Sequence, residues 1–157
     1  MICFYPGPSK LYPSVKHHLM NAYDSGLLER NHRSLPFEEL MANTISLLKS
    51  KLNIPDDYVI NFCSSATESW EIIAQSFTQY ESTHLYNGAF GRKWLEYASK
   101  IKPKSNGFSF ELNETIETSF DLIKDVPELI CITQNETSNG TQVSNKQISQ
   151  LKNNFQN

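Results

Sequence analysis

The chain has 157 residues, of which 39% are hydrophobic and 20% charged, with a formal net charge of −3. This length and apolar content are typical of one globular domain with a core and argue against a disordered chain. The 14 lysines and arginines are scattered, so we expect neither a nucleic-acid nor an acidic-membrane partner. No apolar run approaches the roughly 18–20 residues that cross a bilayer, and Met1–Pro8 lacks the pattern of a secretion signal.

Three cysteines, Cys3, Cys63 and Cys131, are widely spaced and lie among apolar neighbours. An odd number at this spacing favours neither a disulfide framework nor a zinc site. We therefore expect three buried thiols in a reducing cytoplasm.

Helical and strand-like patterns alternate along most of the chain. Pro13 suits the first turn of a helix, and Ser34 fits the N-cap of the next one. The polar loop at 25–34 is the expected boundary between an N-terminal arm with a substrate loop (1–34) and a sheet domain (35–157). The expected elements, in chain order, are a helix at 13–24, a helix from 35 to about 52, a strand at 58–63, a helix at 67–79, a strand at 83–86, a helix at 90–101, a weak strand near 107–110, a helix at about 114–124 with Asn113 as its cap, a strand at 129–133 and a helix near 145–155.

Strands that alternate with helices predict crossover connections and a mostly parallel sheet. The strands at 58–63 and 129–133 show almost no polar alternation, as expected for strands covered on both faces. The predicted fold class is therefore α/β, a three-layer α/β/α arrangement. After the helix at 145–155 the pattern requires another strand, so we expect a part of a longer protein or a chain that needs a partner to complete its sheet.

Three predicted strands end abruptly in small, polar or glycine residues, at Ser64–Thr67, Asn87–Gly91 and Gln134–Gly140. In open α/β sheets, ligands bind beyond the carboxyl ends of parallel strands. These three segments are therefore one candidate site, assembled from distant parts of the chain.

Two of these segments offer groups for a flat, phosphorylated ligand. Small side chains at Ser64–Thr67 would let a phosphate approach a helix N-terminus, although Ser and Thr also occur there as ordinary N-caps. Phe90, between Gly88 and Gly91, would present an aromatic face for stacking, or would fold into the core instead.

Two other segments are rich in polar groups. Asn135–Thr141 supplies many donors and acceptors after a buried strand, and the alternative is a solvated loop with an Asn-Gly turn. His32 and Arg33 precede a helix and would bind a carboxylate or phosphate, unless they are simply solvated beside a helix cap. No spacing of metal ligands is present.

Taken together, these motifs resemble the class V aminotransferases, which are pyridoxal 5'-phosphate enzymes of the aspartate-aminotransferase fold, and most closely their phosphoserine branch. The resemblance covers nearly the whole chain and implies an incomplete large domain that binds the cofactor. The matching motifs are Phe4–Ser9, Asn31–Phe37, Leu52–Tyr58, the turn at 64–67, Asn87–Gly91 and Asn135–Thr137.

The resemblance implies a role for each cofactor-binding residue. The backbone of Ser65, Ala66 and Thr67 would hold the cofactor phosphate at a helix start. Phe90 would stack on the pyridine ring, and Thr137 would hydrogen-bond the phenolic oxygen.

The resemblance also implies substrate contacts. His32 and Arg33 would bind the substrate phosphate from across the interface of a homodimer, and Ser9 would border the substrate. The implied reaction, in serine biosynthesis, converts glutamate and 3-phosphohydroxypyruvate to 2-oxoglutarate and phosphoserine.

This sequence departs from the family in two respects. The Ser64–Thr67 turn replaces a glycine-rich turn with a phosphate-binding arginine and looks more like the Gly-Ser-Gly-Thr turn of other class V members. The family's aspartate against the pyridine nitrogen and its Schiff-base lysine would both lie beyond Asn157. We therefore expect these 157 residues alone to be inactive. Two alternatives stay open: a class V aminotransferase of the alanine or serine–glyoxylate type, and a non-catalytic half-domain that binds ligands or assembles with a partner.

Overall fold

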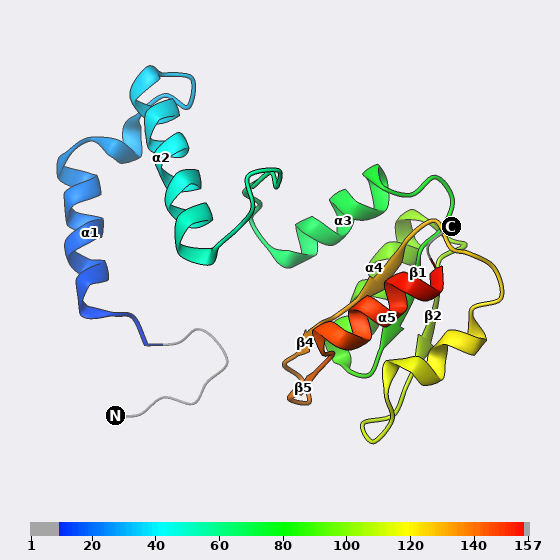
Figure 1. Cartoon of the computed structure of the whole chain (residues 1–157). Coiled ribbons are helices and arrows are strands. Elements are labelled where there is room, and N and C mark those ends of the chain that lie inside the picture. The colour runs from blue at the N-terminus through cyan, green and yellow to red at the C-terminus, as the bar shows by residue number, and fades with distance from the viewer. Residues whose placement is uncertain (1–9, 156–157) are drawn as a thin grey trace. The chain divides into compact units, whose positions relative to one another are not determined.

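A computed structural model describes residues 10–155 of the chain. The fold divides into two compact units, Met1–Phe62 and Cys63–Asn157 (Figure 1). The predicted boundary at residue 34, between an N-terminal arm and a sheet domain, stays a prediction.

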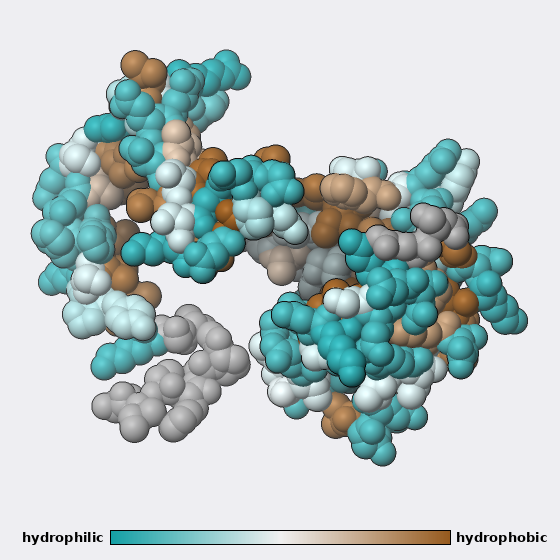
Figure 2. All heavy atoms as spheres, viewed as in Figure 1, coloured by the Kyte–Doolittle hydropathy of each residue, from teal (hydrophilic) through white to brown (hydrophobic). Residues whose placement is uncertain are grey.

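The first unit contains helices α1 (Pro13–Asp24) and α2 (Leu35–Leu52), with a short 3-10 helix, η1 (Leu27–Glu29), between them. Both α-helices begin where the sequence predicts, α1 with Pro13 in its first turn and α2 after Ser34. No side chain among residues 10–62 is buried. Figure 2 accordingly shows apolar residues at the surface of this unit, among polar ones. The described part of the unit therefore has no core of its own.

The predicted strand at 58–63 is wrong. Residues 58–63 form no strand, and Tyr58, Val59 and Phe62 are all exposed, Val59 by 82%. A strand needs a neighbour to pair its backbone N–H and C=O groups, and no described strand pairs with this run. An apolar run without such a neighbour does not form a strand.

The second unit is built on a parallel sheet, as predicted. Its three strands lie in the order β2-β1-β3, and β1 pairs in parallel with both neighbours. A two-stranded antiparallel hairpin, β4-β5, follows the sheet. The elements of this unit, in chain order, are α3 (Ala66–Ser76), β1 (Thr83–Tyr86), α4 (Ala89–Ile101), β2 (Asn106–Ser109), η2 (Ile116–Leu122), β3 (Ile130–Ile132), β4 (Asn135–Glu136), β5 (Thr141–Gln142) and α5 (Asn145–Phe155).

The two faces of β1 show why the unit has three layers. Adjacent strand residues point to opposite faces, and Leu85 joins the buried core with Ile116 of η2 and Leu151 of α5. On the other face, the His84 ring lies edge-on against Trp94 of α4, with centroids 5.5 Å apart. Helices therefore cover both faces of the sheet, which confirms the predicted α/β/α arrangement.

Two predicted elements take a different form. The segment at 114–124 is the 3-10 helix η2 without a side-chain cap, so Asn113 does not cap it. Residues three apart share a face in a 3-10 helix, and Ile116 and Ser119 are both buried. The segment after β3 contains the β4-β5 hairpin, which turns at Gly140 with a φ of 77°.

The described cysteines are free, but only Cys131 is buried as predicted, and burial raises the pKa of its thiol to about 12. Cys63 is exposed, because the strand expected to carry it does not form. Cys3 lies outside the described residues. Within residues 10–155, no helix combines the length and apolar character needed to span a membrane.

Candidate functional site

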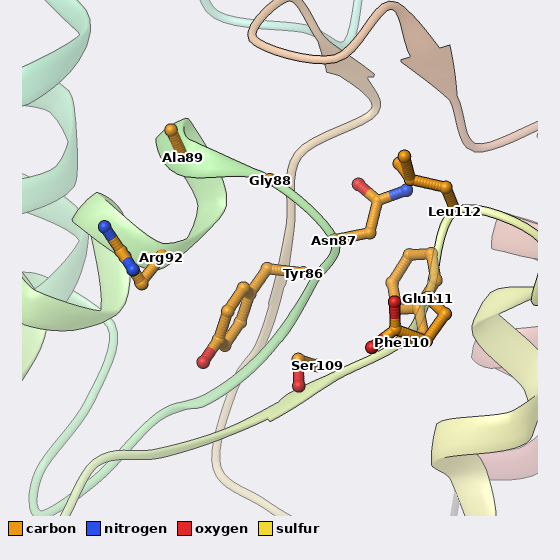
Figure 3. Close-up of a pocket in the computed structure, with 9 residues that line it drawn as sticks. All are labelled: Tyr86, Asn87, Gly88, Ala89, Arg92, Ser109, Phe110, Glu111 and Leu112. Atoms are coloured by element: carbon orange, nitrogen blue, oxygen red, sulfur yellow. The ribbon is translucent and has the colours of Figure 1, made fainter.

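The carboxyl ends of β1 and β2 meet at one edge of the sheet, where α4 begins. Because the strands are parallel, Tyr86 and Ser109 end at the same level and are paired in register. Figure 3 shows this edge, with Asn87 and Gly88 leading from β1 into α4. An open cleft of about 310 Å³ lies here, and Arg92 and Glu111 are among its lining residues.

The first turn of α3 carries the predicted phosphate contacts. Ser65 is the N-cap, and its hydroxyl accepts a hydrogen bond from the Glu68 backbone N–H at 3.2 Å. The N–H groups of Ala66 and Thr67 belong to the first turn of the helix, so they have no intrahelical acceptor. Short side chains and free donors at a helix N-terminus suit a phosphate group.

Glu68 adds a negative charge to this turn. Its carboxylate accepts hydrogen bonds from the Ser64 hydroxyl, at 2.7 Å, and from the Ser64 backbone N–H. These bonds lower the pKa of Glu68, so the carboxylate stays ionised. The donors of Ala66 and Thr67 remain available, but a bound phosphate would share the turn with this charge.

Aromatic stacking joins α3 and α4 near their starts. The Trp70 and Trp94 rings stack with centroids 5.9 Å apart and an interplanar angle of 14°. Each tryptophan lies in the second turn of its helix. Ser65 and Phe90 therefore each lie about one helical turn before this contact.

Phe90 lies in the first turn of α4 and its side chain is 45% exposed. The alternative of a core phenylalanine is therefore wrong. A half-exposed ring at a helix start has a free face for a flat ligand. Thr137, also exposed, follows β4 directly.

Glu136 of β4, a residue that the sequence reasoning missed, joins Phe90 to Thr137. This carboxylate is only 2% exposed and accepts a hydrogen bond from the Gly91 backbone N–H at 3.0 Å. The N-cap of α4 is Gly88, which has no side chain to satisfy the first N–H groups of the helix. The glycine at the N-cap position of α4, which leaves the first N–H groups without a side-chain acceptor, was the available sequence signal.

The hairpin also fixes the turn between β1 and α4. Asn87 donates to the Thr141 hydroxyl at 2.9 Å, and Asn139 donates to the Asn87 carbonyl at 2.8 Å. A Cβ on Gly88 would overlap the Glu136 side chain. The segment at 135–141 is therefore tied to the sheet edge, and the alternative of a merely solvated loop is wrong.

The predicted substrate residues lie elsewhere in the chain. His32 and Arg33 are exposed in the first unit, where the Arg33 backbone N–H donates to the Asn31 side chain at 2.8 Å. Ser9 lies outside the described residues. A common role for these three residues and the cofactor residues stays a prediction.

Comparison with known proteins supports the resemblance seen in the motifs. No family model matches the chain. The chain is 27% identical over 143 residues to the phosphoserine aminotransferase of Leptospira biflexa and 28% identical over 156 residues to that of Lysinibacillus sphaericus. These alignments cover 85% and 88% of the chain but only 39% and 42% of the relatives, so the chain spans about two fifths of their length.

Solved structures of aminotransferases share the fold of this chain. The chain superposes on a phosphoserine aminotransferase from Cytophaga hutchinsonii with a TM-score of 0.85 and 33% identity, over 95% of this chain and 41% of that one. An alanine–glyoxylate aminotransferase from Nostoc matches with a TM-score of 0.69 at 20% identity, which shows a shared fold alone. The predicted resemblance to part of a class V aminotransferase is confirmed.

Proposed function

We propose that this chain is the cofactor-holding part of a pyridoxal-phosphate-dependent transaminase of the phosphoserine aminotransferase kind. The observation that carries the proposal is the Trp70–Trp94 stack, which joins α3 and α4 near their starts. Free backbone donors lie at one start, and an exposed Phe90 lies at the other. This combination fits a flat ring with a phosphate on one side.

Each residue then has a distinct task in holding the cofactor. The backbone N–H groups of Ser65, Ala66 and Thr67 donate to its phosphate, and the α3 dipole favours the negative charge. Phe90 stacks on the ring and excludes water from that face, and the Thr137 hydroxyl donates to the phenolic oxygen. The cofactor, when bound, supplies the electron sink for amino-group transfer.

The proposed substrates are small amino and keto acids that carry a phosphate, namely phosphoserine and 3-phosphohydroxypyruvate with glutamate and 2-oxoglutarate. Arg33 would grip the substrate phosphate with two hydrogen bonds, assisted by His32 and Ser9, from a second subunit of a homodimer. A cytoplasmic place in serine biosynthesis agrees with the free thiols of Cys63 and Cys131. These 157 residues alone would hold the cofactor without catalysing transfer.

Ligand binding by the chain tests the cofactor site. The probe is 4′-deoxypyridoxine 5′-phosphate, which has no aldehyde and so cannot react with surface lysines. Both tryptophans lie in α3 and α4, so quenching of their fluorescence should report binding. We expect saturable quenching, and weaker binding of the same compound without its phosphate.

Two variants with one control make this test specific. Phe90→Ala should weaken binding about two- to twelvefold, since stacking contributes about 0.5–1.5 kcal/mol. Phe77→Ala removes another exposed phenylalanine of the unit and should have no effect. Ser65→Ala keeps the backbone donors and should change the affinity little. Equal binding by the Phe90 and Phe77 variants would contradict the proposed ring contact.

The substrate assignment needs the full product of the reading frame. If that product continues with a strand, an aspartate and a lysine as in the family, the half-domain alternative fails. Arg33→Ala should then lower kcat/KM for the phosphorylated substrate about 10- to 100-fold, because a charge-assisted hydrogen bond contributes about 1.5–3 kcal/mol. Arg30→Ala, in the same exposed loop, is the matched control. Undiminished activity of Arg33→Ala would favour the alanine–glyoxylate type, which the small-residue turn at Ser64–Thr67 also allows.

A further inference from the structure

Glu136 is a buried carboxylate whose partners are hydrogen-bond donors from two separate elements. From α4 it receives the backbone N–H groups of Gly91, at 3.0 Å, and Phe90, at 3.4 Å. From its own hairpin it receives the backbone N–H of Ser138, at 3.1 Å, and the Ser138 hydroxyl, at 2.6 Å. No lysine or arginine within residues 10–155 forms a salt bridge with it.

These bonds join the two segments that would contact a ring from different sides. Phe90 lies on α4, whereas Thr137 follows Glu136 in the hairpin, 47 positions along the chain. Ser138 closes a second link, because its hydroxyl accepts a hydrogen bond from the Ala89 backbone N–H at 2.9 Å. The helix start and the segment with Thr137 are therefore tied together on both sides of Glu136.

The carboxylate is held in its charged form. Burial by itself raises the pKa of Glu136, but the hydrogen bonds from Ser138, Gly91 and Phe90 outweigh burial and keep the pKa below its usual value. A negative charge at a helix N-terminus is further stabilised by the helix dipole. Every partner is a donor, so a neutral amide at this position would turn its own NH₂ group toward another donor.

We propose that Glu136 is a positioning residue, which sets the Phe90 ring and the Thr137 hydroxyl in one fixed arrangement for a flat, phosphorylated pyridine ligand. This inference rests on the proposed function of the same site. A ligand that contacts two exposed side chains on separate elements binds more weakly when those elements must become ordered on binding. The hydrogen bonds of Glu136 order both elements before the ligand binds.

The first test measures the hydrogen bonds between Glu136 and its partners in the absence of ligand. In Glu136→Gln, amide hydrogen exchange at Gly91 and Ser138 should be at least tenfold faster than in the wild-type chain. Asp121→Asn is the matched control, because it removes an exposed carboxylate of η2 in the same unit, outside the lining of the cleft. Unchanged exchange at Gly91 and Ser138 in Glu136→Gln would overturn the proposal.

The second test measures how the hydrogen bonds of Glu136 affect the affinity for the ligand. Glu136→Gln should bind 4′-deoxypyridoxine 5′-phosphate at least tenfold more weakly, while Asp121→Asn binds as the wild type does. Binding is measured under conditions in which urea unfolding, followed by tryptophan fluorescence, shows each variant to be folded, which separates positioning from general destabilisation.

A second variant keeps the test decisive if Glu136→Gln does not fold. Ser138→Ala removes the hydroxyl that bridges Ala89 and Glu136 at the surface, and should weaken binding in the same direction by about threefold. If these variants bind as tightly as the wild type, the positioning role fails although the cofactor site stands. If the wild-type chain itself does not bind the probe, the proposed function fails, and the positioning role fails with it.

Discussion

His84 makes the stability of the second unit sensitive to acid. It lies on the central strand β1, is 1% exposed, and its Nε2 is 2.9 Å from the Ser82 hydroxyl. The ring meets the indole of Trp94 edge-on. Neither partner carries a charge, so nothing offsets the loss of hydration of a protonated imidazole. Burial therefore lowers the pKa of His84 from 6.5 to about 4.

The sign and size of the effect follow from proton linkage. Above pH 6.5 His84 is neutral in both the folded and the unfolded chain, so its contribution does not change with pH. As the pH falls from 6.5 to about 4, the unfolded chain binds a proton that the folded chain excludes, and the folded state loses stability. Each pKa unit corresponds to about 1.4 kcal/mol, so the limiting loss is about 3 kcal/mol.

Urea unfolding at pH 7.5 and pH 4.5 measures this loss, with tryptophan fluorescence as the signal. The wild-type free energy of unfolding should fall by roughly 2–3 kcal/mol more than that of His84→Phe, which cannot titrate. Comparing the two chains removes the contribution of the carboxylates. His18→Gln, an exposed histidine, should follow the wild type. If His84→Phe loses as much stability as the wild type at pH 4.5, the reasoning is refuted.

Three further predictions follow from the same unit. Gly88→Ala should destabilise the unit by about 1–3 kcal/mol in urea unfolding, because the new Cβ overlaps Glu136. An unchanged urea midpoint would mean that the hairpin does not contact this turn closely. Ser65→Ala should cost about 1 kcal/mol through the lost N-cap, while the neighbouring Ser64→Ala keeps that cap and should cost less. In the folded chain, a thiol reagent should label Cys63 and leave Cys131 unmodified, since burial raises the Cys131 pKa to about 12. Peptide mapping by mass spectrometry distinguishes the two cysteines. Equal labelling would contradict the burial of Cys131.

Local sequence signals predicted most of the helices and strands. Pro13, Ser34 and the apolar period located α1 and α2, and the predicted strand at 83–86 is β1 as the structure has it. These elements depend on neighbours within a few positions along the chain. The predicted strand at 58–63 failed for the opposite reason, because a strand exists only where another strand accepts its hydrogen bonds.

The segments of the candidate site could be predicted from the sequence, but the hydrogen bonds between them could not. The ends of β1 and β3 pointed to Phe90 and Thr137, since parallel strands bring their carboxyl ends to one edge. Glu136 was missed, because its polar side chain in a polar segment gives no local sign of burial. Its partner Gly91 is 45 positions away in the chain.

The sequence by itself determined the α/β class, the parallel sheet and the small-residue segments at the strand ends, because these depend on periodicity and on short motifs. Only the tertiary structure decided that Glu136 caps α4, that Trp70 and Trp94 join α3 and α4 near their starts, and that His84 is buried without a charged partner. Each of these depends on contacts between distant segments. Such contacts are set by which faces pack against one another, and no short stretch of sequence contains that information.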